Sequence, residues 1–368
     1  MVTIKEIARS VGVSAATVSR VLNYDATLSI SAVKRQAIIE TAEALNYLTP
    51  RHRNRAGNGL VPGPNGVTRV ALVHSLTPVQ ELADPYYVGV RLGIEHRCQT
   101  LKLECMKVCL ADGMADPSLL AGAAGLIAVG THLPEEVAFL QRVTRSLVFA
   151  DVCPQQEILD GVESDLSSAT TRLLDALFEI GYRRIAFVGG MDTRSGTPEP
   201  YGERRCAAYR AWMAEKGLAD PGLCRVGRMR FEDGYALMGQ MLDEGVVPEV
   251  VVAANDNMAI GAYRAIQERG FRIPKDIGVV GFNDIPAAQF LSPPLTTIKI
   301  HAERIGEIAV DLVNELILGR DYAKRVVIST DLIWRDSCRR PADAAKAAAG
   351  RLEAARAAQA ATGRVASA

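Results

Sequence analysis

The stretch from Thr3 to Asn23 has apolar residues at the period of a helix, interrupted once at Gly12. Thr3 and Glu6 have the spacing of a capping box, which predicts the start of a first helix. Gly12 can take the positive φ that ends a helix, and Ser14 can cap a second one. One face of each helix is apolar, formed by Ile4, Ile7, Ala8 and Val11 in the first and by Val18, Val21 and Leu22 in the second. The pattern therefore predicts two packed helices joined by a tight turn.

The opposite face of the second predicted helix has small side chains and one cation, namely Ala15, Ala16, Ser19 and Arg20. Small residues let a helix enter the major groove of a duplex, where alanine methyls can touch thymine methyls and Arg20 can bond guanine. The alternative is an amphipathic helical hairpin with no role in binding. The expected DNA contacts of this region are completed by Thr3, Ser14, Thr17 and Asn23.

The remaining pattern predicts one more helix and then an α/β core. Ser31 is expected to cap a helix that runs to Leu45, in which Ile38 and Ala42 close a small all-α core. Short apolar runs that predict strands follow at 70–74, 103–110, 126–129, 147–150, 184–189, 250–254 and 277–282. Helical patterns lie at 86–98, 167–180, 203–216, 232–244, 257–269 and 302–318. This alternation predicts parallel sheets with crossover helices, and the strands suffice for two doubly wound lobes.

The composition is that of a globular protein, with 48% hydrophobic and 23% charged residues among 368. No apolar run reaches the roughly 18 residues that span a bilayer, and the first residues predict a capped helix rather than a signal peptide. We therefore expect no membrane association and a cytoplasmic location. Seven cysteines without C-x-x-C spacing fit a reduced compartment. Cys105 and Cys109 have no histidine pair nearby, which favours buried thiols over a metal site, and we expect no cofactor.

Charge is unevenly distributed along the chain. Lys+Arg and Asp+Glu both number 42, so the formal net charge is zero, which at first argues against nucleic acid. Residues 1–60, however, contain eight cations and four anions, a net charge of +4, and the rest of the chain carries −4. A basic N-terminal segment is expected for a DNA-binding module attached to a sensor.

The run TIKEIARSVGVSAATVSRVLN resembles the headpiece of the LacI/GalR family of bacterial transcriptional regulators, although Ser10 stands where the family usually has alanine. The resemblance extends over nearly all of the chain. It implies a helix-turn-helix headpiece with a basic hinge over 1–60 and a two-lobed periplasmic-binding-protein-like core over 61–340. The resemblance further implies three crossings between the lobes, with about 67–163 and 294–322 in lobe one and about 164–293 and 323–338 in lobe two. The tail over 341–368 is rich in alanine with scattered charge, so we expect a disordered segment or a frayed helix and assign it no function.

The stretch from Pro50 to Gly66 is basic and then rich in glycine and proline, which predicts a linker. In the family, a short hinge helix lies here and inserts a leucine into the minor groove. This sequence lacks the usual A-R-x-L ending, and Arg55 falls about where the leucine would be. We expect the linker to contact DNA by charge, through Arg51, Arg53 and Arg55.

Ligands of open parallel sheets bind at the carboxyl ends of the strands, so the residues after each apolar run are the candidates for an effector site. These positions and the helices that follow them supply His74, Tyr86, Tyr87, Arg205, Phe231, Asn255 and Asn283. Amides, an arginine and aromatic rings suit a polyhydroxylated ligand. The two tyrosines can equally be core residues, and Asp256 and Asp284 can simply cap helices, which is the preferred interpretation of Asp256. The resemblance implies effector contacts for Arg205, Asn255 and Asn283, the last at a position where the family commonly has aspartate.

The leading hypothesis is a homodimeric repressor that binds a pseudo-palindromic double-stranded operator and changes its affinity when a small sugar binds between the lobes. DPYYVGVRLGIE and FLSPPLTTIKIHAE most resemble family members that govern β-galactosidase operons, which favours a galactoside. A transport-type sugar receptor without a DNA role and a regulator with a purine effector are the alternatives. An enzyme is not expected, because no metal spacing, nucleophile elbow or acid–base pair is visible.

Overall fold

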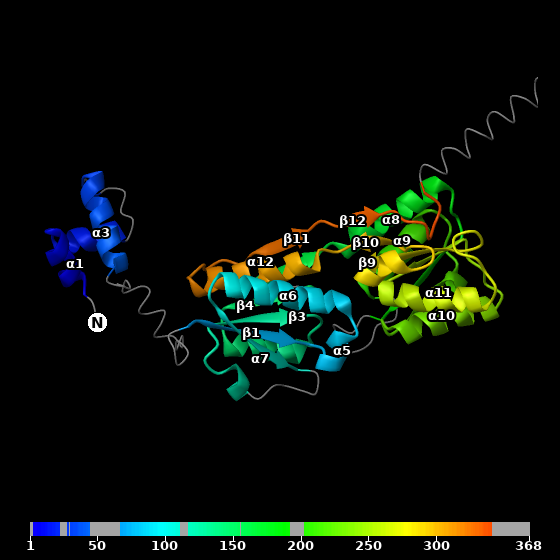
Figure 1. Ribbon diagram of the computed structural model, residues 1–368, viewed down its shortest axis with the longest axis horizontal. Helices are drawn as coiled ribbons and strands as arrows, with labels where there is room; N and C mark the ends of the chain where they lie inside the picture. Colours follow the sequence, from blue (N-terminus) through cyan, green and yellow to red (C-terminus); the bar gives the residue numbers. More distant parts are fainter. Residues whose placement is uncertain are drawn as a thin grey trace, which may run out of the picture. The chain divides into compact units, whose positions relative to one another are not determined.

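The computed structural model describes residues 3–22, 28, 30–44, 67–110, 117–154, 156–191 and 202–340. They belong to two compact units, a small helical one at the N-terminus and a larger one that contains both sheets (Figure 1). The predicted DNA contacts at Asn23, Arg51, Arg53 and Arg55 and the tail over 341–368 lie outside the described residues.

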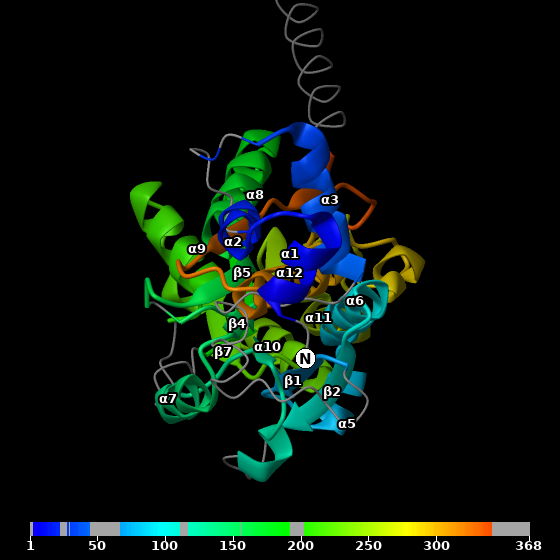
Figure 2. The ribbon, with the colours of Figure 1, turned by 90° about the vertical axis from the view of Figure 1, so that its left-hand side faces the viewer.

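The N-terminal unit, here called the headpiece, contains α1 (Ile4–Val11), α2 (Ala15–Leu22) and α3 (Ala32–Ala44), which Figure 2 shows together. Its core is formed by side chains from all three helices, namely Ile7, Ala8, Val18, Val21, Ile38 and Ala42. Ser31 accepts a hydrogen bond from the backbone N–H of Lys34 at 3.4 Å, as expected for the cap of α3. The predicted all-α core is therefore present, and Leu45 lies outside the described residues.

The first lobe contains a parallel sheet of six strands in the order β11-β5-β4-β3-β1-β2. Its strands are β1 (Arg69–His74), β2 (Glu104–Cys109), β3 (Gly125–Val129), β4 (Leu147–Ala150), β5 (Asp160–Ser164) and β11 (Arg325–Ile328). Its helices are α5 (Pro78–Leu82), α6 (Pro85–Thr100), η1 (Pro117–Leu120), α7 (Pro134–Val143) and α12 (Ala302–Ile317). α6 and α12 lie side by side on one face, and α7 lies on the other (Figure 1). The two paired helices approach closely, since a Cβ on Gly93 would lie 2.0 Å from the carbonyl oxygen of Glu303.

The second lobe has the same design. Its sheet has the order β12-β10-β9-β8-β6-β7, in which only β12 runs antiparallel to its neighbour. The strands are β6 (Ile185–Gly190), β7 (Cys224–Gly227), β8 (Val250–Ala253), β9 (Gly278–Asn283), β10 (Thr296–Lys299) and β12 (Asp331–Ile333). The helices are α8 (Leu166–Ile180), α9 (Arg204–Glu215), η2 (Pro221–Leu223), α10 (Phe231–Asp243), α11 (Asp256–Glu268) and η3 (Pro286–Phe290). The expected pair of doubly wound α/β lobes is confirmed.

The chain passes between the lobes three times, after β5, after β10 and after β11. Two of these crossings lie a few residues later than the boundaries implied by the resemblance. Thr296–Lys299, expected in lobe one, pairs with β9 of the second sheet. Arg325–Ile328, expected in lobe two, pairs with β5 of the first sheet. The reason is that both segments still form ladder hydrogen bonds with the sheet from which the chain is about to depart.

Among the described helices, none combines the length and the apolar character that a bilayer crossing requires.

Candidate functional sites

The turn between α1 and α2 is built by local hydrogen bonds. The backbone N–H of Thr3 donates to Glu6 Oε2 at 2.6 Å, which fixes the start of α1. Gly12 has a φ of 68° and ends that helix, a left-handed conformation that glycine takes without a Cβ clash. Ser14 Oγ then accepts from the N–H of Thr17 at 3.1 Å and caps α2. Gly12 and Ser14 therefore form the turn between α1 and α2 that the sequence predicts.

The outer face of α2 presents Ala16 and Arg20, which are exposed, and Thr17 and Ser19, which are half-buried. Ala15 differs from the prediction, because it is half-buried and packs against the headpiece core. The cause is its spacing from Val18, since residues three apart on a helix share a face. Of the predicted base-contacting residues of α2, Ala16, Thr17, Ser19 and Arg20 therefore lie on its outer face.

In the first lobe, two predicted aromatic residues converge on a carboxylate that was not predicted. Tyr86 OH donates to Asp151 Oδ1 at 2.6 Å, and Tyr87 OH donates to Asp151 Oδ2 at 2.9 Å. Asp84 caps α6 by accepting from the N–H of Tyr86, which places both tyrosines in the first turn. We call Tyr86, Tyr87 and Asp151 the carboxylate clamp. Burial raises the pKa of Asp151, an effect that the two tyrosine hydroxyls oppose.

His74 lies beside this clamp at the end of β1. Its ring is fully buried and meets the ring of Tyr87 edge-on, with 5.4 Å between the centroids. Nδ1 accepts from the N–H of Leu76 at 3.0 Å, which assigns the ring proton to Nε2. Burial lowers the pKa of His74 to about 4, so the ring is neutral at pH 7. Nε2 has no hydrogen-bond partner in the part of the chain that the structure describes, which leaves a buried donor next to Tyr87.

In the second lobe, Arg205 and Asn255 are brought together at Met229. Asn255 Nδ2 donates to the Met229 carbonyl at 3.2 Å, and Arg205 Nη2 lies 3.5 Å from the Met229 sulfur. Arg205 also donates to the Ala254 carbonyl and pairs with Glu203 through Nε at 3.0 Å. Both side chains are buried, with exposed fractions of 8% for Arg205 and 3% for Asn255. Two polar groups are therefore held rigidly where β6 and β8 end.

Neither Asp284, after β9, nor Asp256, after β8, caps the helix that follows it, although the sequence allowed this for both. Asn283 ends the strand with a φ of 109°, and Asp284 pairs with Arg335 at 2.7 Å. Asp256 does not cap α11 as preferred above, because the neighbouring Asn255 does so by accepting from the N–H of Met258 at 2.8 Å. The carboxylate of Asp256 instead accepts from Thr297 Oγ1 at 2.7 Å and from the Ile285 N–H at 2.9 Å.

Phe231 begins α10 and is 36% exposed. Its place in the predicted effector site stays a prediction.

The two halves of the predicted site interact electrostatically. The charge of Arg205, in the second lobe, acts on Asp84, Tyr86 and Asp151 of the first, in each case lowering the pKa. Burial, the dominant effect, raises the pKa of Asp84 to about 6. Asp151 was missed by sequence reasoning, although it directly follows the apolar run 147–150. Because ligands of parallel sheets bind at the carboxyl ends of strands, the same reasoning applied to 147–150 would have identified Asp151.

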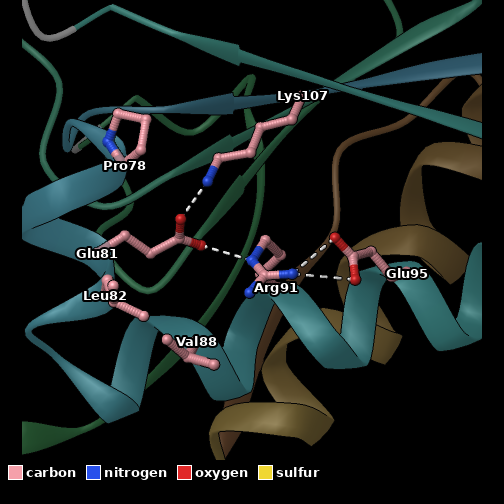
Figure 3. Close-up of a pocket in the computed structure, with 7 residues that line it drawn as sticks. All are labelled: Pro78, Glu81, Leu82, Val88, Arg91, Glu95 and Lys107. Carbon is pink, nitrogen blue, oxygen red and sulfur yellow. Dashed lines mark hydrogen bonds and ion pairs between the residues drawn. The ribbon is translucent and has the colours of Figure 1, made fainter.

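A separate pocket of about 230 Å³ lies on the first lobe and is lined by Pro78, Glu81, Leu82, Val88, Arg91, Glu95 and Lys107 (Figure 3). Buried Glu81 accepts from Arg91 Nε at 2.8 Å and pairs with Lys107. None of the predicted effector residues lines this pocket. Among the described residues, no group of three or more His, Cys, Asp or Glu side chains is arranged to hold a metal ion.

A helical headpiece whose second helix presents a small, cationic face, joined to two doubly wound lobes, is the architecture of a ligand-responsive DNA-binding regulator. Residues 3–50 match the family described as "Bacterial regulatory proteins, lacI family", and residues 174–338 match the one described as "Periplasmic binding protein-like domain". The HTH-type transcriptional repressor MelR of Bacillus subtilis is 33% identical over 92% of this chain and 98% of its own length. The chain therefore belongs to the LacI family of bacterial regulatory proteins.

Two further likenesses bear on the same assignment. The lactose operon repressor of Rhizobium radiobacter is 58% identical over 110 residues, which are 30% of this chain and 97% of that sequence. A crystal structure of the Lac repressor dimer bound to operator and the anti-inducer ONPF has a TM-score of 0.65 and 25% identity, and the match covers 91% of this chain and 98% of that one.

Proposed function

We propose that this protein is a cytoplasmic, homodimeric transcriptional repressor that binds a pseudo-palindromic operator and changes its affinity when a small, galactoside-like sugar binds between the two lobes. The headpiece and hinge over 1–60 bind DNA, and the core over 61–340 binds the effector and dimerises. The chain acts by binding and is not an enzyme. The Lac repressor dimer bound to operator supports the assembly, and the lactose operon repressor supports a galactoside, since lactose is one.

The observation that carries the effector part of this proposal is the pair of buried polar side chains at the strand ends, Arg205 and Asn255. Groups held in this way cost free energy to desolvate, and they are the donors that fix the hydroxyls of a sugar. Asn283 is the third polar contact, and Tyr86, Tyr87 and His74 bind the sugar from the first lobe. Phe231 supplies a flat apolar face.

The operator part rests on α2. Arg20 reads guanine from the exposed face, Ala16 and Thr17 approach base edges, and Ala15 and Ser19 lie at the border of the contact. Thr3 and Ser14, which precede α1 and α2, bind phosphates, as residues at helix starts commonly do, and Asn23 completes the predicted contact. Arg51, Arg53 and Arg55 extend the contact by charge.

The test begins with the operator, which is obtained by selecting duplexes from a random pool with the full-length protein. Fluorescence anisotropy on that duplex is then measured with lactose, melibiose, galactose, ribose and adenine added separately. A change in operator affinity with one of the galactosides and none with adenine is the expected result. A response to adenine alone contradicts the sugar assignment, and failure to enrich any sequence contradicts the operator assignment.

The site is tested with variants that keep the fold. Asn255→Ser keeps the oxygen that caps α11 but removes the amide donor, and Arg205→Lys removes the guanidinium fork. Each should weaken sugar binding by about tenfold without changing operator affinity in the absence of sugar. Arg210→Ala, on the exposed face of the same helix, is the matched control. Wild-type sugar affinity in Arg205→Lys and Asn255→Ser together would place the effector elsewhere.

A further inference from the structure

Two thiols of the second lobe lie in direct contact. Cys206 Sγ, in the first turn of α9, is 3.7 Å from Cys224 Sγ, at the start of β7. Both cysteines are free thiols, and both belong to the buried core of this lobe. A disulfide has an S–S distance of about 2.05 Å, so the two sulfurs need to approach each other by less than about 2 Å. Rotation of the side chains and a small shift of α9 can provide this approach.

Cys224 is the thiol better placed to react first. β7 is the outermost strand of its sheet, and Cys224 keeps an exposed fraction of 6%, whereas Cys206 has none. A hydrogen bond with the Cys206 thiol lowers the pKa of Cys224. The charges of Arg210 and Arg225 act in the same direction, against the effect of burial. Because the thiolate is the form that attacks an oxidant, Cys224 is the nucleophile of the pair.

Cys206 is also connected to the predicted effector residue Arg205. Glu203 Oε2 accepts from the N–H of Arg205 at 3.1 Å and from the N–H of Cys206 at 3.3 Å. Oε1 of the same carboxylate accepts from Arg205 Nε at 3.0 Å. A displacement of Cys206 therefore reaches the guanidinium of Arg205 both through the backbone and through Glu203.

A second pair of thiols lies in the first lobe. Cys98, in the last turn of α6, and Cys105, on β2, form a hydrogen bond with each other. Neither cysteine is adjacent in the sequence to a predicted effector residue. The pair in the second lobe is therefore the one whose oxidation acts on the predicted effector site.

We propose that Cys206 and Cys224 are a modification site, at which hydrogen peroxide joins the two thiols in a reversible disulfide. The Cys224 thiolate attacks one peroxide oxygen, the O–O bond breaks and hydroxide departs, which leaves a sulfenic acid on Cys224. The Cys206 sulfur then attacks the Cys224 sulfur, the S–O bond breaks, and the oxygen departs as water with the proton of Cys206. Overall, the two thiols lose two electrons and two protons, and the peroxide becomes two molecules of water.

The disulfide is expected to weaken sugar binding, a consequence that rests on the proposed function. With both thiols free, Arg205 donates to the Ala254 carbonyl and lies 3.5 Å from the Met229 sulfur. Closing the S–S bond moves the start of α9 and therefore moves the guanidinium from this position. Loss of one well-placed hydrogen bond lowers affinity by up to about tenfold.

Peptide mapping of the full-length protein tests the disulfide itself. The protein is treated with hydrogen peroxide, its remaining thiols are blocked, and it is digested with trypsin. Trypsin cuts between the two cysteines, which then lie in separate peptides, 206–210 and 217–225. The expected product is these two peptides linked to each other, and the link should be absent when dithiothreitol is added before blocking. Two unlinked cysteines, or a link from either of them to a different cysteine, overturn this inference and leave the proposed function standing.

Calorimetry with galactose and lactose tests the effect on the site. The oxidised protein should bind the sugar more weakly, by up to about tenfold, and dithiothreitol should restore the affinity. Dithiothreitol leaves methionine sulfoxide in place, so this recovery separates the disulfide from oxidation of Met229. Cys206→Ala should be insensitive to peroxide. Cys338→Ala, which removes another buried thiol of the same lobe, is the matched control and should respond as the wild type does.

The outcomes separate the two proposals. Unchanged sugar affinity in protein that carries the disulfide, or an equal loss in Cys206→Ala, contradicts the effect of oxidation on the site. Failure of the reduced protein to bind either sugar contradicts the proposed function, and peptide mapping then still decides whether the disulfide forms.

Discussion

Glu163 and Arg204 form an ion pair that joins the two lobes, with 2.9 Å between Oε2 and Nη1. Glu163 belongs to β5 of the first lobe, and Arg204 is the first residue of α9 in the second. The pair is partly exposed, with 18% of the glutamate side chain and 24% of the arginine side chain accessible. Since Arg205 follows Arg204 directly, this pair connects the start of α9, which carries the predicted effector residue Arg205, to the opposite lobe.

Loss of this pair should loosen the site around its ligand. A partly exposed ion pair contributes up to about 1 kcal/mol, so Arg204→Ala is expected to weaken sugar binding by up to about fivefold. Calorimetry with the sugar found by the operator assay measures the effect. Arg264→Ala, which breaks a pair within α11, is the control. A double variant with the two charges exchanged should recover part of the loss, and wild-type affinity in Arg204→Ala would show that the pair does not hold the lobes.

His74 gives the core a specific dependence on pH. An unfolded chain protonates histidine near its ordinary pKa of 6.5, whereas buried His74 stays neutral down to about pH 4. The contribution of neutral His74 to the free energy of unfolding is therefore full above pH 6.5 and is lost as the pH falls toward 4. In His74→Gln, the drop in unfolding free energy between pH 7.5 and pH 5 should be smaller by about 2 kcal/mol. Guanidinium chloride unfolding checks this, with His96→Gln, whose side chain is 72% exposed, as the control. Equal drops in both variants would contradict it.

Arg20 is expected to supply sequence specificity. A bidentate contact with guanine is worth about 1–3 kcal/mol per half-site, so Arg20→Ala should lose most specific binding and keep weak, salt-sensitive association. Anisotropy on the selected operator and on a random duplex measures both terms. Lys34→Ala, at an exposed position of α3, controls for the loss of one charge. An equal loss on the two duplexes would assign Arg20 to phosphate.

The arginines of the linker should make operator binding unusually dependent on salt. Each neutralised phosphate adds about 0.9 to the slope of log affinity against log salt. Replacing Arg51, Arg53 and Arg55 with glutamine should therefore make that slope clearly shallower. A slope unchanged within error would mean that the linker is only a tether.

The headpiece could be predicted almost residue by residue, because each of its signals is local. The capping box at Thr3, the stop at Gly12 and the cap at Ser14 all act over three or four residues. The burial of Ala15 could not be predicted, because it depends on which side of α2 packs against the other helices. Only the assembled core decides that.

Strands were predicted where a buried apolar run exists and missed where pairing alone creates them. β5 begins with Asp160 and Gly161 and resembles a loop in sequence, yet it is held between β4 and β11. β10 and β11 likewise take their identity from distant partners. Their pairing also explains why two lobe boundaries were placed too early.

In the predicted effector site, the sequence identifies the strand ends but not the partners that meet there. Asn255 and Asp256 are adjacent, and by residue type either could cap α11. Asp256 instead accepts hydrogen bonds from Thr297 and Ile285, which come from distant parts of the sequence, so Asn255 is the cap. The clamp is similar, because nothing local links Asp151 to residues 86 and 87.

The three crossings of the chain also determine the order in which the protein can be completed during synthesis. The described helices of the headpiece end by residue 44, so this unit can fold while the ribosome is still making the core. The first lobe, in contrast, waits for Arg325, which pairs with Gly161. Until then β5 has an open edge, and such edges pair readily with other chains. A chain that stops before β11 therefore carries a finished DNA-binding unit on an aggregation-prone core.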